Sequence, residues 1–150
     1  MCTLCIVPCG NRKIWGKYPD KGATKAKDVY IGPFTSKCGK YAMHFYPDSW
    51  YILSAKYGFL HPDDIVTEAY DVTFNDKSTN PITIKELIKQ ASAKGLDKYN
   101  EIVIVAGEDY AKIVRQVFTG KNIRTPLKGC LGIGYMLQRL NDAIKNDMGL

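Results

Sequence analysis

Four short apolar segments, separated by helix-like stretches, constrain the fold of this chain more than any other feature. They cover residues 3–8, 50–55, 101–106 and, more weakly, 122–127. The first three are nearly continuous runs of aliphatic and aromatic residues, which is typical of strands buried on both faces of a sheet. Alternation of such strands with helices predicts an α/β fold with three layers. We expect a mainly parallel sheet of about four or five strands with helices on both faces.

Helices are predicted over residues 35–46, 83–94, 109–118 and 133–146. Thr35 or Ser36 is the expected cap of the first helix. Thr83 and Glu86 have the spacing of a capping box at the start of the second, and Gly95 is suited to end it. A length of 150 residues with 45% hydrophobic and 24% charged residues fits a single α/β domain spanning residues 1–150.

The charge of the chain is uneven. Residues 1–60 carry nine basic and three acidic side chains and so have a net charge of +6, which equals the net charge of the whole chain. A basic face suits a polyanionic partner such as a nucleic acid, because contacts to phosphates release counterions. A solvated lysine-rich surface accounts for the same numbers equally well.

Neither a membrane partner nor a secreted location is expected. No apolar run approaches the roughly 18–20 residues that cross a bilayer, and the first ten residues lack the basic start of a signal peptide. We therefore expect a cytoplasmic protein. The sequence carries no signal of its oligomeric state.

Five cysteines are present, and in a cytoplasmic chain they predict reduced thiols rather than disulfides. They are Cys2, Cys5, Cys9, Cys38 and Cys130. The first three are closely spaced, but strand residues four apart lie about 13 Å from each other. Cys5 and Cys9 therefore do not suit one metal ion, and we expect neither a metal site nor a cofactor.

Two long segments, residues 10–29 and 56–80, are expected to be loops that follow the first and second strands. Loops of this length are uncommon in compact domains and are usually functional or mobile. Both leave from the carboxyl edge of the predicted sheet, as does Gly107 after the third strand. Ligands of open α/β sheets bind at that edge, so a site is expected there.

The first of these loops opens with a thiol and basic residues. Cys9 lies beside Arg12 and Lys13, whose positive charge favours a thiolate nucleophile. The backbone N–H groups at Gly10 and Asn11 are placed to bind an anion. A solvated glycine turn with a structural thiol is the alternative.

The second loop region combines a hydroxyl, an ammonium group, aromatic rings and carboxylates, which together suit a base-binding site. Tyr57 and Tyr70 provide rings on which a planar group stacks. Asp71 or Glu68 is suited to orient a base or to act as a general base. Lys13 and Lys56 are expected to bind an anion or phosphate, and Lys56 forms the expected catalytic set with Cys9 and Asp71. The members of this region are Ser54, Lys56, Tyr57, Gly58, Glu68, Tyr70 and Asp71.

A glycine-rich turn precedes the last predicted helix. Lys128 and Gly129 begin it, and Gly132 and Gly134 continue it. Such an entry to a helix exposes N–H donors that suit an anion. Close backbone packing explains these glycines about as well.

Several motifs together resemble the small-domain relatives of the YaaA peroxide-stress proteins. They include Tyr30 and Gly32 in a Tyr-x-Gly element before a helix, the stretch 53–62 (LSAKYGFLHP) and the following Tyr70. The resemblance implies site roles for Tyr30 and Gly32 and a connection to nucleic acid. A shorter similarity, Pro-Cys followed by Lys13, is to archaeosine synthase, which modifies a deazaguanine base in transfer RNA. It implies a related fold and pocket.

The leading hypothesis is an enzyme that acts on a nucleobase or modified base, in a nucleic acid or a nucleoside. The reaction would be N-glycosyl cleavage or group transfer. One alternative is a non-enzymatic DNA- or RNA-binding protein linked to stress or repair. A small-molecule-binding domain with no nucleic-acid role is another.

Overall fold

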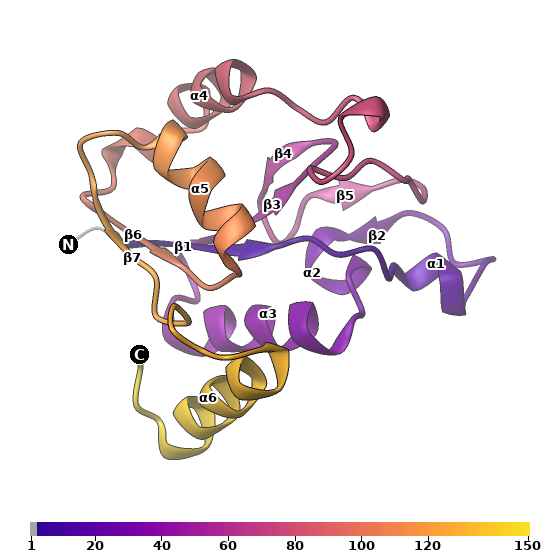
Figure 1. Ribbon diagram of the computed structural model, residues 1–150. Helices are drawn as coiled ribbons and strands as arrows, with labels where there is room; N and C mark the ends of the chain where they lie inside the picture. The colour runs from indigo at the N-terminus through magenta and orange to yellow at the C-terminus, as the bar shows by residue number, and fades with distance from the viewer. Residues whose placement is uncertain (1–2) are drawn as a thin grey trace.

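A five-stranded sheet forms the centre of the computed structural model, which describes residues 3–150 (Figure 1). Its strand order is β4-β3-β1-β6-β7. The strands are β1 (Thr3–Pro8), β3 (Trp50–Ser54), β4 (Gly58–Leu60), β6 (Glu101–Ile104) and β7 (Asn122–Arg124). β1 runs parallel to β3 and β6, β6 runs parallel to β7, and only β4 is antiparallel to its neighbour.

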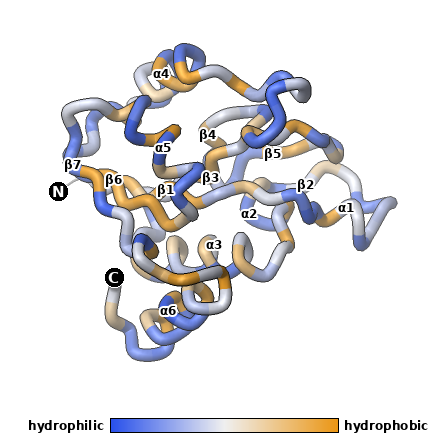
Figure 2. Tube along the Cα trace, viewed as in Figure 1, coloured by the Kyte–Doolittle hydropathy of each residue, from blue (hydrophilic) through white to orange (hydrophobic). Residues whose placement is uncertain are grey.

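Helices cover both faces of the sheet. α4 (Ile84–Ala93) and α5 (Glu108–Val117) lie on one face, while α3 (Pro33–Phe45) lies on the other with α6 (Ile133–Asn146) packed against it (Figure 1). Alternate residues of β1 supply the two cores: Leu4 and Ile6 pack toward α4 and α5, and Cys5 and Val7 toward α3. The central strands are coloured as hydrophobic along much of their length (Figure 2). The predicted α/β architecture is confirmed.

Helix starts follow local chemistry. α3 begins at Pro33, directly after Gly32, and no side chain caps it. The expected caps Thr35 and Ser36 are wrong, because proline is preorganised for the first helical position and moves the start upstream. The capping box of α4 is confirmed: the Thr83 hydroxyl accepts from the Glu86 N–H at 3.1 Å.

The two segments expected as loops contain regular structure. The first holds α1 (Ile14–Lys17), β2 (Thr24–Lys25) and α2 (Ala26–Val29), and the second holds β4, β5 (Ile65–Val66) and a 3₁₀ turn at Lys77–Thr79. β2 pairs with β5 in an antiparallel two-stranded sheet. The loop assignment was wrong there, because strands of two or three residues are too short to show a period. The pairing joins the two segments that follow β1 and β3.

The edge strand β4 is tied to α4 by side chains. The Gln90 amide oxygen accepts from the Phe59 N–H at 2.9 Å, and its Nε2 donates to the Tyr57 carbonyl at 2.9 Å. The Lys94 ammonium donates to the Phe59 carbonyl at 2.5 Å. Gly58 takes a φ of +79° in this turn, and a Cβ there would lie 2.2 Å from Gln90 Oε1. The turn after β3 is therefore held in place by side chains of α4, which packs on the sheet.

Over residues 3–150, no helix combines the length and the apolar character that crossing a membrane requires.

Candidate active site

The chain leaves β1 at the carboxyl edge of the sheet through Cys9 and Gly10. A Cβ on Gly10 would lie 2.9 Å from the Thr35 hydroxyl oxygen, so the backbone passes close to α3 only because this residue is glycine. The Gly10 carbonyl accepts a hydrogen bond from Lys13 Nζ at 3.1 Å. The lysine side chain therefore folds back over the turn that carries it.

A chain of buried hydroxyls starts at the end of β3. Ser54 Oγ accepts from the backbone N–H groups of Lys56 at 3.2 Å and Tyr57 at 3.1 Å. Both lone pairs of a hydroxyl oxygen are then used, so its hydrogen is left to donate to the Tyr70 hydroxyl at 2.7 Å. The Tyr70 hydroxyl also hydrogen-bonds the Tyr30 hydroxyl. Segments after β1 and β3 are joined through these three side chains.

The two tyrosines of this hydrogen-bonded group, Tyr30 and Tyr70, stay neutral at ordinary pH. Burial raises the pKa of Tyr70 to about 12 and raises the pKa of Tyr30 well above its usual range. A buried phenolate would be costly, because the surroundings solvate its charge poorly. The hydroxyl chain therefore offers neutral donors and acceptors rather than charge.

Lys13 is the buried cation of the site. Lys13 is 8% exposed, and its Nζ lies 4.4 Å from the centroid of the Tyr70 ring. Burial lowers the pKa of Lys13, against smaller opposing effects of Cys9 and Asp71. Among the salt bridges formed within residues 3–150, none involves Lys13. The amine is thus held by a carbonyl and an aromatic face rather than by a carboxylate.

A second ammonium group lies near the same rings. Lys56 Nζ is 5.2 Å from the Tyr57 ring centroid and 5.5 Å from that of Tyr70. The two rings meet edge to face with centroids 5.3 Å apart. Unlike Lys13, the Lys56 side chain is exposed. The two lysines therefore approach one aromatic pair from a buried and a solvated position.

Cys9 is 8% exposed and its thiol lies against Tyr110. Sγ is 3.2 Å from the Tyr110 hydroxyl, which also donates to the Cys9 carbonyl at 3.2 Å. From the sequence, residues 109–118 were expected only to form a helix, so this contact of Tyr110 was missed. Its position three residues after Gly107, at the same edge of the sheet, was the available signal.

A cavity of about 690 Å³ opens beside Lys13. Three cations and one carboxylate line it, together with the Tyr70 side chain. Cys9 is not in its wall, and Asp71 is exposed. Gly16, Lys17, Ile31 and Ala69 were not predicted as site residues. The full wall is Asn11, Arg12, Lys13, Gly16, Lys17, Ile31, Ala69, Tyr70 and Asp71.

Some expected site residues lie elsewhere. Gly32 precedes α3, Gly58 forms the turn against Gln90, and Glu68 is exposed. Three others, Gly107, Lys128 and Gly129, share a second cavity of about 280 Å³ at the start of α5. The glycine-rich turn is therefore separate from the Lys13 cavity.

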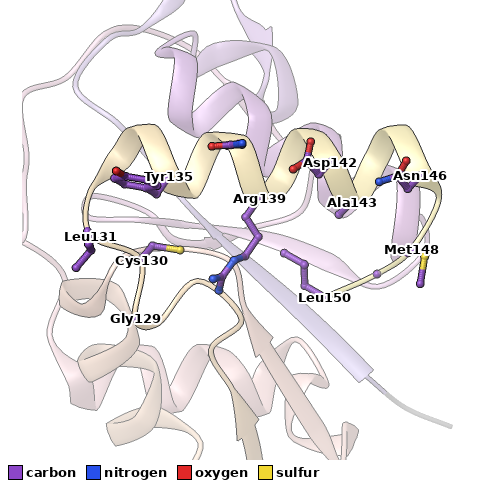
Figure 3. A pocket seen from close by; sticks show the side chains of 12 residues that line it. Gly129, Cys130, Leu131, Tyr135, Arg139, Asp142, Ala143, Asn146, Met148 and Leu150 are labelled. Atoms are coloured by element: carbon purple, nitrogen blue, oxygen red, sulfur yellow. The ribbon is translucent and has the colours of Figure 1, made fainter.

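A further groove, of about 560 Å³, runs along α6 (Figure 3). Arg139 extends across it and donates to the Pro126 carbonyl at 2.7 Å. Leu131 at one end is 89% exposed, and Arg139 and Asp142 are also exposed. This groove lacks the buried charged group that distinguishes the Lys13 cavity within residues 3–150.

Metal ligands are not gathered in the part of the chain that the structure describes: no group of three or more His, Cys, Asp or Glu side chains suits an ion there. Cys2 lies outside the described residues. Burial raises the pKa of Cys5 and of Cys38 far above the usual range, so both remain protonated core thiols.

Two comparisons place the chain among known proteins. Residues 4–142 match the model of a family of unknown function, DUF6884, and the chain belongs to that family. It is also similar to the uncharacterized protein YfjM of Bacillus subtilis (strain 168), with 44% identity over 146 residues that cover 97% of each chain.

These findings correct the family expectation. The chain belongs to DUF6884, and neither match relates it to the YaaA proteins or to archaeosine synthase, so both resemblances were wrong. The nucleic-acid connection and the related pocket that they implied lose that support.

Proposed function

We propose that this DUF6884 member is an enzyme that acts on a nucleobase or modified base, in a nucleic acid or a nucleoside, by N-glycosyl cleavage or group transfer. The observation that carries the proposal is the buried Lys13 amine, held over the Tyr70 ring in the wall of a basic cavity. A buried ionisable group with a shifted pKa in a cavity marks candidate active sites.

The size and charge of the cavity support this ligand class. Its volume of about 690 Å³ falls within the range of roughly 300–1,000 Å³ that is usual for small-ligand sites. Arg12 and Lys17 favour an anionic group such as a phosphate. Tyr70 gives the wall an aromatic surface for a planar group. A nucleotide unit combines these two features.

Asp71 supplies the carboxylate at the mouth of the cavity. The carboxylate is exposed and is suited to accept an N–H of a base or a proton from the reaction. Cys9 remains a predicted nucleophile. Its thiol faces Tyr110, so reaction with a ligand requires that contact to open.

The test is a thermal-shift screen with nucleobases, nucleosides, deazaguanines and nucleotides. A ligand at 100 times its Kd stabilises the folded state by about 2.7 kcal/mol. We expect a shift for the wild type, a loss of that shift in Asp71→Asn, and an unchanged shift in Asp20→Asn, an exposed control. Equal shifts in all three proteins would contradict the placement of the site.

A non-enzymatic nucleic-acid-binding protein is the second candidate, favoured by the basic excess of residues 1–60. Lys25 and Lys27 each lie within 4 Å of Asp63, at 3.8 and 3.7 Å, which lowers the charge they offer. This candidate predicts that log affinity falls by about 0.9 per contacted phosphate for each log unit of salt. Binding to DNA and RNA that ignores salt, or no binding, would exclude it.

A further inference from the structure

Lys13 differs from the ordinary lysines of this chain in burial. More than nine-tenths of the residue is removed from solvent, yet it lines a cavity. One N–H of the amine is directed to the Gly10 carbonyl, and the Tyr70 ring lies 4.4 Å away. Both contacts hold Nζ in one place at the cavity wall.

Burial also favours the neutral amine, against smaller opposing effects of Cys9 and Asp71. Lys25 and Lys27 have an Asp63 carboxylate nearby, whereas no salt bridge within residues 3–150 reaches Lys13. Desolvation lowers the pKa of Lys13, which increases the fraction that carries a free lone pair. Desolvated lysines of this kind are the nucleophiles that form Schiff bases.

A proton acceptor lies at the same cavity. Asp71 is in its wall and its charge acts on Lys13. The exposed carboxylate can exchange protons with water, so it is suited to receive a proton from the amine and to return it.

We propose that the Lys13 amine is the nucleophile of a glycosyl transfer and forms a Schiff base with the C1′ carbon of a nucleoside sugar. The inference rests on the proposed function, whose site it shares. It assigns the covalent step to the amine rather than to the Cys9 thiol.

The step balances with groups already named. Nζ bonds to C1′ while the bond from C1′ to the base nitrogen breaks, and the base leaves with that electron pair. Asp71 takes one proton from Nζ and passes it to the departing base. The nitrogen lone pair then forms the C=N bond as the C1′–O4′ bond breaks, and O4′ takes a proton from solvent. Water later hydrolyses the iminium and releases the sugar aldehyde and the amine.

The experiment traps this intermediate in the wild-type protein. We would incubate it with sodium cyanoborohydride and, separately, an oligodeoxynucleotide bearing one abasic site or glyceraldehyde 3-phosphate. Peptide mass spectrometry is expected to place the reduced adduct on Lys13. Lys13→Arg and Lys13→Met should lower the yield at least tenfold, whereas the exposed control Lys21→Arg should retain it.

A second measurement uses only the wild-type protein, so it does not depend on whether a variant folds. Trace acetylation from pH 6 to 10 reports the pH at which each amine becomes reactive, and restricted access changes the rate but not this inflection. The inflection of Lys13 is expected below that of Lys21. Equal inflections, with no adduct on Lys13, would overturn the inference.

The outcomes separate the two proposals. Nucleobase-dependent thermal shifts without an adduct from either aldehyde would leave the base site standing and overturn the Schiff base. An adduct on Lys13 without any nucleobase shift would show a reactive amine, but it would overturn the nucleobase function and with it the glycosyl transfer. An adduct on other lysines alone would count against Lys13.

Discussion

The hydroxyl chain at the end of β3 makes a quantitative prediction for Ser54→Ala. The Ser54 hydroxyl makes three hydrogen bonds, at 3.2 Å to the Lys56 N–H, 3.1 Å to the Tyr57 N–H and 2.7 Å to the Tyr70 hydroxyl. A hydrogen bond contributes about 1 kcal/mol net, and a buried group left without a partner costs about 1–3 kcal/mol. Since Ser54 is fully buried, we expect Ser54→Ala to lower the free energy of unfolding by about 2–4 kcal/mol.

Urea unfolding followed by circular dichroism measures this loss, and Ser92→Ala, on the exposed surface of α4, is the control. Tm should fall by roughly 4–16 °C, because 1 kcal/mol corresponds to about 2–4 °C in a chain of this size. The double-mutant cycle of Ser54→Ala and Tyr70→Phe should show a coupling energy of about 1 kcal/mol, since both variants remove the hydrogen bond between the two hydroxyls. A loss below about 0.5 kcal/mol, or additive effects within about 0.3 kcal/mol, would refute the reasoning.

Three further predictions follow from other parts of the structure. Gly58→Ala should lower the free energy of unfolding, measured by urea unfolding, by about 2 kcal/mol or more, because φ is +79° and the new Cβ would lie 2.2 Å from the Gln90 side-chain oxygen. The control Gly22→Ala should have a free energy of unfolding near that of the wild type, because its Cβ meets nothing within 4 Å. The pKa of Lys13 is lower in the folded state than in the unfolded state, so between these two pKa values the unfolded state binds more protons. In that range the free energy of unfolding of the wild type should rise with pH relative to that of Lys13→Met. Parallel curves of unfolding free energy against pH for the two proteins would contradict this. In the native protein, a thiol reagent at pH 7.5 should label the partly exposed Cys130 and spare Cys5 until unfolding, and rapid labelling of Cys5 would contradict its burial.

Much of the fold was predictable because long apolar strands and helices leave strong periods in the sequence. β1 and α6 have the predicted bounds, and α3, α4 and α5 differ from prediction by one or two residues at each end, whereas α1 and α2 were not predicted. The pairing of β2 with β5 was not predictable, because each strand has two residues and their partners are about 40 residues apart. The antiparallel β4 was missed because three residues after a turn show no alternation.

The grouping of residues at one edge of the sheet was predictable where topology decides it. Residues following β1 and β3 had to meet at one edge, so Lys13, Ser54 and Tyr70 were all named in advance. The burial of Lys13 was not, because no sequence pattern distinguishes a lysine under an aromatic ring from a solvated one. Tyr110 was missed for a related reason: its helical spacing indicates packing, and only three-dimensional proximity places its hydroxyl beside Cys9.

The ties between α4 and β4 have a consequence for assembly. An edge strand ordinarily presents free backbone N–H and C=O groups to which a strand of another chain can add. Here the N–H and the carbonyl of Phe59, the middle residue of β4, are occupied by Gln90 and Lys94. The same two side chains that fix the turn therefore close this margin of the sheet to intermolecular strand addition, and they protect the protein from growing into an extended sheet on that side.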